Sequence, residues 1–193
     1  MKQSSKKTKT KKEKPFSKLS KPEKRVAIAK DVLEQLKLKI YTADSGRYVA
    51  YLRFIDTENY PGKNEDIKTN FDKIQHCYVC AMGACLMSAT KFANKLNFSD
   101  IGSTIGDLRN EKVKKLFSSI FDPKQLLMIE IAFEGDTMRE NAYRIGYEIF
   151  NVDNDNDLRH SCHKFYRRYE ENDEERLIAI MKNIIKNKGE FKP

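Results

Sequence analysis

The N-terminal segment from Met1 to Lys14 contains seven lysines and no apolar side chain after Met1. A segment of this composition cannot bury enough apolar surface to offset the conformational entropy that ordering would cost. We therefore predict that residues 1–20 form a disordered Lys-rich tail and that the folded part begins at residue 21.

The positive charge of the chain is concentrated in the same region. Residues 1–25 hold 11 basic and two acidic residues, which accounts for the whole formal charge of +9, whereas residues 26–193 hold 26 of each sign. A flexible polycation is expected to lie along the phosphates of a nucleic acid or on an acidic protein surface. The predicted nucleic-acid contacts in the tail are Lys6, Lys7, Lys9, Lys11, Lys12 and Lys14.

Residues 21–193 are predicted to form a single helical globular domain of the mostly α class. Ser20 and Glu23 fit a capping box, and apolar residues then recur at helical spacing, which predicts an amphipathic helix over 21–39. Further helices are predicted over residues 77–96, 110–121, 123–135, 136–150, 158–170 and 172–189.

One short β-hairpin is predicted between the first two helices. Ile40–Ala43 and Tyr48–Leu52 are rich in β-branched and aromatic residues, and they flank the turn signal Asp44–Gly46. Since a lone hairpin is marginally stable in water, we expect it to pack on the helices.

The chain has no apolar run near the roughly 20 residues that cross a bilayer. No apolar segment of the kind found in a signal peptide follows its basic start. We therefore expect a soluble intracellular protein without membrane contact, in which the four cysteines are reduced thiols or metal ligands rather than disulfides.

All seven cysteine and histidine residues lie in two short stretches of the chain. Structural zinc takes four thiolate or imidazole ligands, often as two close pairs. Cys77 and Cys80 fit one such pair, and two of the residues in the second stretch would supply the other: His160, Cys162 and His163. The alternative is plain packing, because small residues let a neighbouring helix approach closely. Packing is favoured, so no cofactor is expected, and zinc is the alternative.

The stretch from His163 to Tyr169 alternates basic and aromatic residues. Such a stretch can contact phosphates and stack on bases, which makes Lys164, Arg167 and Arg168 candidate nucleic-acid contacts. On a helix, however, the aromatic residues would face the core and leave the three cations in water. This solvated arrangement is the favoured interpretation.

Three stretches of the folded part carry distinctive patterns. They are Arg25–Val32, Cys77–Ala84 with the pattern Cys-x-Val-Cys-Ala-x-Gly-Ala, and Glu175–Pro193 with Ile-Met-x-Asn-Ile-Ile-x-Asn-x-Gly-x-Phe-x-Pro. Together with Gln125–Glu134 they resemble a family of small proteins from tailed bacteriophages and bacteria. The resemblance implies a phage-linked origin, and a location in the cytoplasm of a bacterial host cell or in the virion. It implies no activity and transfers no catalytic residue.

The charge layout favours a non-enzymatic accessory protein of phage type. Its tail would bind nucleic acid or a nucleoprotein with little sequence specificity, because phosphate contacts carry no sequence information. The first alternative is an antagonist or regulator that binds a host protein through the neutral folded part. A third hypothesis is a zinc-stabilised or thiol-dependent enzyme, although no local signature of a cysteine hydrolase occurs and no catalytic residue is predicted.

Overall fold

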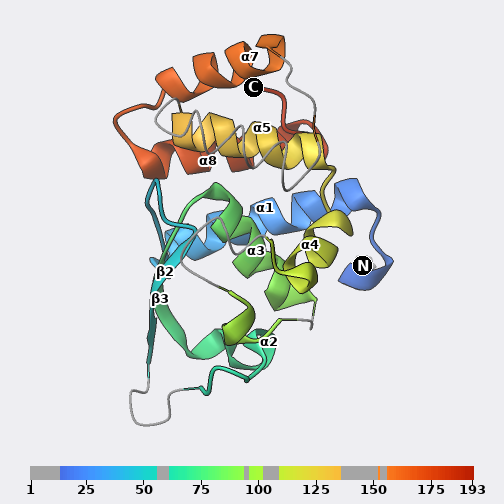
Figure 1. Cartoon of the computed structure of the whole chain (residues 1–193), viewed down its shortest axis with the longest axis vertical. Helices are drawn as coiled ribbons and strands as arrows, with labels where there is room; N and C mark the ends of the chain where they lie inside the picture. Colours follow the sequence, from blue (N-terminus) through green and yellow to red (C-terminus); the bar gives the residue numbers. More distant parts are fainter. Residues whose placement is uncertain (1–13, 56–60, 94–95, 102–108, 136–151, 153–155) are drawn as a thin grey trace, which may run out of the picture.

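The computed structural model of the chain describes residues 14–55, 61–93, 96–101, 109–135, 152 and 156–193. These residues are mostly α-helical and carry one small sheet, which confirms the predicted class (Figure 1). The predicted helix over 136–150 lies outside the described residues, as do residues 1–13 of the predicted tail. No helix among the described residues is both long and apolar enough to reach across a membrane.

Most of the described helices begin and end within a few residues of their predicted bounds. The α-helices are α1 (Lys21–Lys37), α2 (Ile67–Asn70), α3 (Ala81–Phe92), α4 (Glu111–Ser118), α5 (Pro123–Glu134), α7 (Asn156–Arg167) and α8 (Asp173–Lys186). The short 3-10 helices are η1 (Phe16–Lys18), η2 (Phe71–Lys73) and η3 (Phe98–Asp100). The strands are β1 (Tyr41–Ala43), β2 (Val49–Phe54) and β3 (Ile74–Val79).

Helix α1 begins with the predicted capping box. The Ser20 hydroxyl accepts a hydrogen bond from the Glu23 amide at 3.4 Å, and the Glu23 carboxylate accepts one from the Ser20 amide at 2.8 Å. Two backbone donors that the helix itself leaves without a partner are thereby satisfied. From this start, α1 buries a face that includes Ile28, Val32 and Leu36.

Replacing Ser20 with alanine is expected to lower the free energy of unfolding by about 1 kcal/mol, because the Glu23 amide loses its acceptor. Ser17→Ala is the matched control, since Ser17 is exposed in η1 and should change stability by less than about 0.5 kcal/mol. Urea denaturation of the two variants measures the difference, and equal stabilities would contradict a stabilising role for the cap.

The sheet corrects the predicted hairpin. Strands β1 and β2 do not pair with each other, because β3 lies between them, parallel to β1 and antiparallel to β2. Tyr41 of β1 lies opposite Cys77, and Val49 of β2 lies opposite Val79. The segment Asp44–Gly46 therefore connects two edge strands rather than two neighbours.

The predicted helix over 77–96 is wrong in its first part, where the chain forms the end of β3. Cys77 and Val79 are both buried, as expected for alternate residues of a strand with one face on the core. Cys80 then becomes the N-cap of α3, and its Sγ accepts a hydrogen bond from the Gly83 amide at 3.4 Å. The strand and the helix thus meet at a cysteine.

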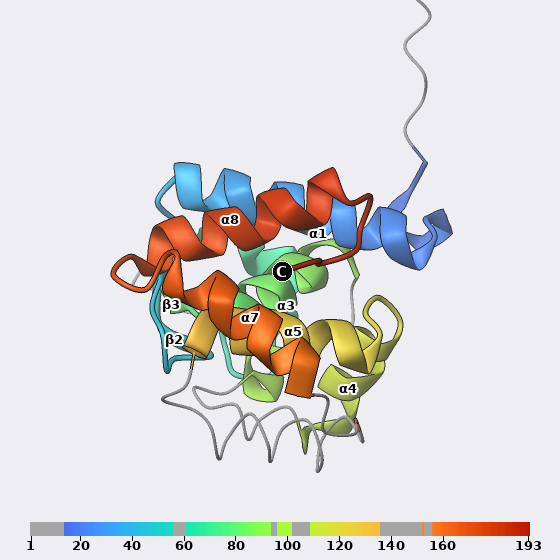
Figure 2. The same cartoon turned by 90° about the horizontal axis from the view of Figure 1, so that it is seen from above.

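Helix α3 lies at the centre of the described fold, and all its residues from Ala81 to Thr90 are buried. Helices α1 and α5 both pack against α3, while α8 packs against α1 and α5. Figure 2 shows α8 running beside α1, and α7 lying over α5 on the outside. The end of β3 and the start of α3 meet at Cys80. Helices from distant parts of the sequence therefore surround this junction.

A buried arginine fastens the C-terminal segment to α1. Arg25 is 2% exposed, and its Nε donates a hydrogen bond to the Gly189 carbonyl at 2.6 Å. Its Nη1 donates to the Ile120 carbonyl at 3.2 Å, and its guanidinium forms ion pairs with Asp122 and Glu190. One side chain thereby joins the start of α1, the end of the α4 region and the segment after α8.

Residues 14–20, which the prediction assigned to the tail, are described in the structure and include η1. The ring of Phe16 in η1 stacks on the ring of Phe92, with 4.8 Å between the centroids and 14° between the planes. On the surface, Lys14 forms an ion pair with Glu23 at 3.5 Å. Phe16 and Lys14 thus both contact the folded part of the chain.

Candidate functional site

The structure does not bring the five predicted zinc ligands together. Cys77 belongs to β3, whereas His160, Cys162 and His163 belong to α7. Helix α7 packs against α5, and α5 in turn packs against α3. Among the described residues, the donor atoms of these five side chains form no group of three that could hold one ion. All four cysteines are buried thiols outside any disulfide.

A different group of potential ligands does converge in the described part of the chain. The Sγ atom of Cys80 and one carboxylate oxygen each of Glu130 and Glu134 lie within 4.8 Å of one another. All three side chains are buried. We refer to these three residues as the Cys–Glu–Glu cluster, and it is the candidate site of the molecule.

Three elements position the cluster. Cys80 is held at the junction of β3 and α3, where its amide donates a hydrogen bond to the Arg47 carbonyl at 2.7 Å. Glu130 and Glu134 are four residues apart on α5, so their side chains lie on the same face of that helix. The loop between β1 and β2 completes the site, because the Gly46 amide donates to Glu134 Oε2 at 2.8 Å.

Burial raises the pKa of every member of the cluster. The pKa of the Cys80 thiol is raised well above its ordinary value by burial, and the charges of the two glutamates add to this effect. The pKa of Glu130 is raised by burial and then by Glu134. For Glu134, burial outweighs the hydrogen bond from Gly46 and raises the pKa to about 7. Burial therefore favours the protonated thiol and disfavours the ionised forms of both carboxyls.

These pKa shifts bear on the hypothesis that the protein is a thiol-dependent enzyme. The nucleophilic form of cysteine is the thiolate, and an apolar, buried setting disfavours it. Burial also raises the pKa values of Cys77 and Cys85 to about 12. None of these three thiols is prepared for nucleophilic attack at neutral pH.

Cations near the cluster are already engaged by other carboxylates. Arg176 is 1% exposed, forms an ion pair with Asp173, and donates to the Tyr169 carbonyl at 2.9 Å. On the loop, Arg47 forms an ion pair with Asp44 at 3.2 Å. Arg176 also lowers the pKa of Glu134, but burial outweighs this effect.

One oxygen atom of the cluster, in the Glu130 side chain, lacks within the described part of the chain the hydrogen bond that buried polar atoms usually form. Glu130 is 2% exposed, and its buried Oε2 has no hydrogen-bond partner among the described residues. Leaving a buried polar atom without a partner costs about 1–3 kcal/mol. The sequence pattern alone does not predict a site at Glu130 and Glu134, although two glutamates four residues apart in the otherwise apolar segment Leu126–Glu134 are an available signal.

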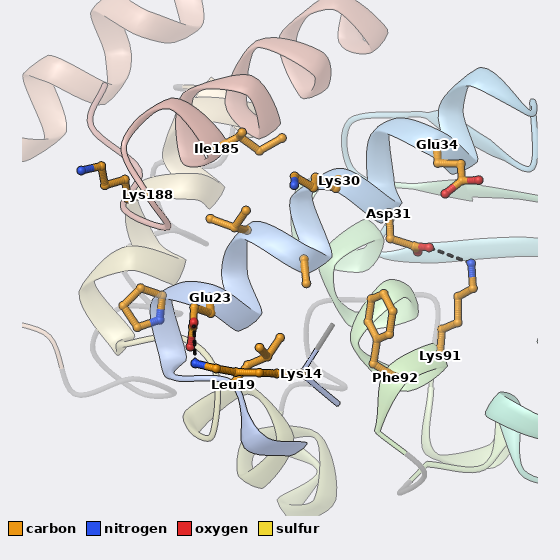
Figure 3. Close-up of a pocket in the computed structure, with 13 residues that line it drawn as sticks. Lys14, Leu19, Glu23, Lys30, Asp31, Glu34, Lys91, Phe92, Ile185 and Lys188 are labelled. Atoms are coloured by element: carbon orange, nitrogen blue, oxygen red, sulfur yellow. Dashed lines mark hydrogen bonds and ion pairs between the residues drawn. The ribbon is translucent and has the colours of Figure 1, made fainter. Parts of the chain in front are cut away.

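A groove of about 910 Å³ runs along the outer face of α1 (Figure 3). Its base includes Val26, Ala27, Phe92 and Ile185. Four lysines line it, and these are Lys14, Lys30, Lys91 and Lys188.

Three acidic residues also line the groove, and two of them are engaged. Glu23 serves the capping box, and Asp31 accepts from Lys91 Nζ at 2.7 Å. Lys30 and Lys188 form no ion pair with any described residue (Figure 3). The groove therefore presents free ammonium groups beside the point where the Lys-rich segment joins the fold.

The predicted contacts on α7 and just after it have the expected exposure. Lys164, Arg167 and Arg168 are exposed, whereas Phe165 is buried and Tyr169 packs against the core. The aromatic residues of this stretch thus serve the core, as the favoured interpretation predicted. The three cations do not line the groove. Of the predicted tail contacts, Lys14 lines the groove, and the other five lie outside the described residues.

Comparison with known proteins adds no assignment, because no family model, no curated protein and no solved structure matches the chain. Its function is therefore inferred from its own residues.

Proposed function

We propose that the chain is a non-enzymatic, phage-type accessory protein that binds nucleic acid through the phosphates, with little sequence specificity. The observation that carries the proposal is the segregation of charge, since the first 25 residues hold the entire formal excess of +9. A nucleic acid attracts such a segment strongly, because neutralising phosphates releases condensed counterions.

The groove on α1 supports the proposal with a second, adjoining surface. Lys14 is the last lysine of the Lys-rich segment and lies in the groove, so the segment enters the fold at this place (Figure 3). Lys30 and Lys188 extend the cationic surface from there. The stacked pair Phe16 and Phe92 adds an aromatic surface at the same end, of the kind on which unpaired bases stack.

The high pKa values of the buried thiols support the non-enzymatic part of the proposal. Burial raises the pKa values of the Cys77 and Cys80 thiols, which disfavours the thiolate that a thiol-dependent enzyme would need. A basic segment beside a body of zero net charge needs no catalytic group in order to bind a polyanion.

The test compares two full-length variants that each lose six positive charges. The first variant, which we call the arm variant, changes the Lys-rich segment. In it, glutamine replaces Lys6, Lys7, Lys9, Lys11, Lys12 and Lys14. In the control, glutamine replaces six exposed lysines elsewhere, namely Lys37, Lys63, Lys68, Lys73, Lys115 and Lys124. Both variants have the same net charge. A difference in their nucleic-acid binding therefore depends on where in the chain the six positive charges were removed.

For the unaltered chain, we expect the logarithm of the affinity for DNA or RNA to fall with the logarithm of salt concentration at a slope near −5, if about six lysines contact phosphates. The arm variant should lose most of this slope, and the control should keep it. Fluorescence anisotropy with labelled oligonucleotides across a salt series measures both. Equal slopes for the two variants would overturn the proposal.

A further inference from the structure

We propose that Cys80, Glu130 and Glu134 bind one zinc ion. This site is independent of the proposed nucleic-acid binding, because no member of the cluster lines the groove or belongs to the Lys-rich segment. It also differs from the zinc site predicted between the two cysteine and histidine stretches, with which it shares Cys80 alone.

The donor set suits zinc. Zinc is borderline-soft and accepts both thiolate and carboxylate ligands, with Zn–S distances of about 2.3 Å and Zn–O distances of about 2.0–2.2 Å. In a tetrahedral site, such bonds place neighbouring donors about 3.5 Å apart. The three donors already lie within 4.8 Å of one another. Bonding geometry therefore requires no pair of these donors to approach by more than about 1.3 Å.

The buried, partnerless oxygen of Glu130 is the observation that points to a bound cation. Hard and borderline cations bind carboxylate oxygens, so an ion in the cluster supplies the partner that Glu130 Oε2 lacks among the described residues. The other two groups have partial contacts of their own, since Gly46 donates to Glu134 and Gly83 donates to Cys80. Each of these bonds favours the negatively charged form that a metal ligand requires.

The surrounding charges also leave room for a divalent ion. Arg47 pairs with Asp44, and Arg176 pairs with Asp173 and lowers the pKa of Glu134 without offsetting the effect of burial. Two positive charges from zinc would reduce the charge of three ionised ligands to one net negative charge. The position opposite the three ligands is left for water. The loop that supplies the Gly46 amide is exposed from Ser45 to Arg47, so the site lies close beneath the surface.

Protons compete with the metal for the same three groups. Zinc binding forms one Zn–S and two Zn–O bonds and sends the protons held by the thiol and the carboxyls into solution. We therefore expect the apparent affinity to rise steeply with pH. This trend separates coordination in the cluster from weak binding to exposed carboxylates, which are already ionised at neutral pH.

Cobalt(II) is the probe, because it replaces zinc and gives an intense thiolate-to-metal absorption in the near ultraviolet. The full-length, metal-free chain is titrated with cobalt and then with zinc at about pH 8. We expect one equivalent of cobalt to bind with this absorption, and zinc to displace it. Less than about a tenth of an equivalent of bound metal would overturn the proposal, since structural zinc is held near stoichiometry.

Three variants assign the ligands. Cys80→Ser should abolish the thiolate absorption, and Glu130→Gln should weaken binding by at least about 100-fold. Cys85→Ser is the matched control, because Cys85 is also a buried thiol of α3 but lies outside the cluster. This variant should leave the thiolate absorption and the metal affinity unchanged. Retention of the absorption in Cys80→Ser, or unchanged affinity in Glu130→Gln, would overturn the assignment. The titration of the unaltered chain decides the matter even where a variant does not fold.

Discussion

Replacing Gly83 with alanine is expected to lower the free energy of unfolding by about 4 kcal/mol or more, which is a large fraction of the roughly 5–15 kcal/mol that stabilises a typical domain. A Cβ atom at this position would lie 1.6 Å from the Tyr48 carbonyl oxygen and 2.6 Å from the Tyr48 carbonyl carbon. Both are backbone atoms, so no side-chain rotation relieves the contact. The helix propensity of alanine favours the substitution by about 1 kcal/mol, which is too little to offset the clash.

The same substitution should also disturb the Cys–Glu–Glu cluster. Tyr48 follows Arg47, whose carbonyl accepts the hydrogen bond from the Cys80 amide at 2.7 Å. Moving this backbone away from α3 breaks that bond and displaces the loop that contacts Glu134.

Gly62→Ala is the matched control for the Gly83 variant. A Cβ atom at Gly62 would meet nothing closer than a Glu65 side-chain oxygen at 3.7 Å, so we expect a change of less than about 1 kcal/mol. Urea denaturation followed by circular dichroism compares the two variants. A Gly83→Ala protein as stable as the Gly62→Ala protein would show that α3 and the start of β2 do not approach as closely as described.

Helix ends were predictable because their signals are local. The capping box of Ser20 and Glu23 and the Asp122-Pro123 start of α5 each depend on residues within one turn. Asn172 likewise caps α8 by accepting a hydrogen bond from the Glu175 amide at 3.0 Å. Such chemistry acts within a few residues and therefore survives in the sequence without knowledge of the fold.

The sheet was mispredicted because its pairing is not local. The two segments that flank Asp44–Gly46 have the composition of a hairpin, yet their common partner is β3, which begins at Ile74. The end of β3, from Cys77 to Val79, was assigned to a helix, because the residues after it favour a helix and no glycine or proline separates the two elements. A strand that stops at Cys80, directly before a helix, gives no clear signal of its own.

The candidate site was hidden for a related reason. The spacing of Cys77 and Cys80 suggested a ligand pair, but the two residues belong to different elements, one to a strand and one to a helix cap. The actual neighbours of Cys80 are two glutamates that follow it by 50 residues or more. Such a group is created by the packing of α3 against α5, which the sequence pattern does not specify.

In metal-free protein, Glu134→Gln is expected to raise the free energy of unfolding above pH 7 by about 3 kcal/mol, and to change it little near pH 4.5. The cause is the pKa of Glu134, which burial raises to about 7 from an ordinary value of 4.5. Between these two values the folded chain binds more protons than the unfolded chain, so stability falls as the pH rises. The stabilising proton is fully present below about pH 4.5 and is lost as the pH passes 7.

Glutamine keeps the shape of the protonated side chain and an oxygen that accepts the hydrogen bond from Gly46. The groups that act on this position remain in place in the variant, and these are Cys80, Glu130, Asp44, Asp173 and Arg176. The comparison therefore reports the titration of Glu134 together with the effect of its charge on Glu130, whose pKa Glu134 raises. Glu171→Gln, at an exposed position, serves as the control and should change stability by less than about 0.5 kcal/mol at either pH.

Urea denaturation at about pH 5 and about pH 8, in the presence of a chelator, measures the effect. The chelator is essential, because the zinc ion that we propose would reverse the expected trend: it would stabilise the ionised cluster, and its contribution would grow as protons leave the ligands. Stability of the unaltered chain should thus fall with rising pH in chelator and fall less, or rise, with zinc present. A Glu134→Gln protein with the same pH dependence as the unaltered chain in chelator would mean that Glu134 is ionised in the folded state at both pH values.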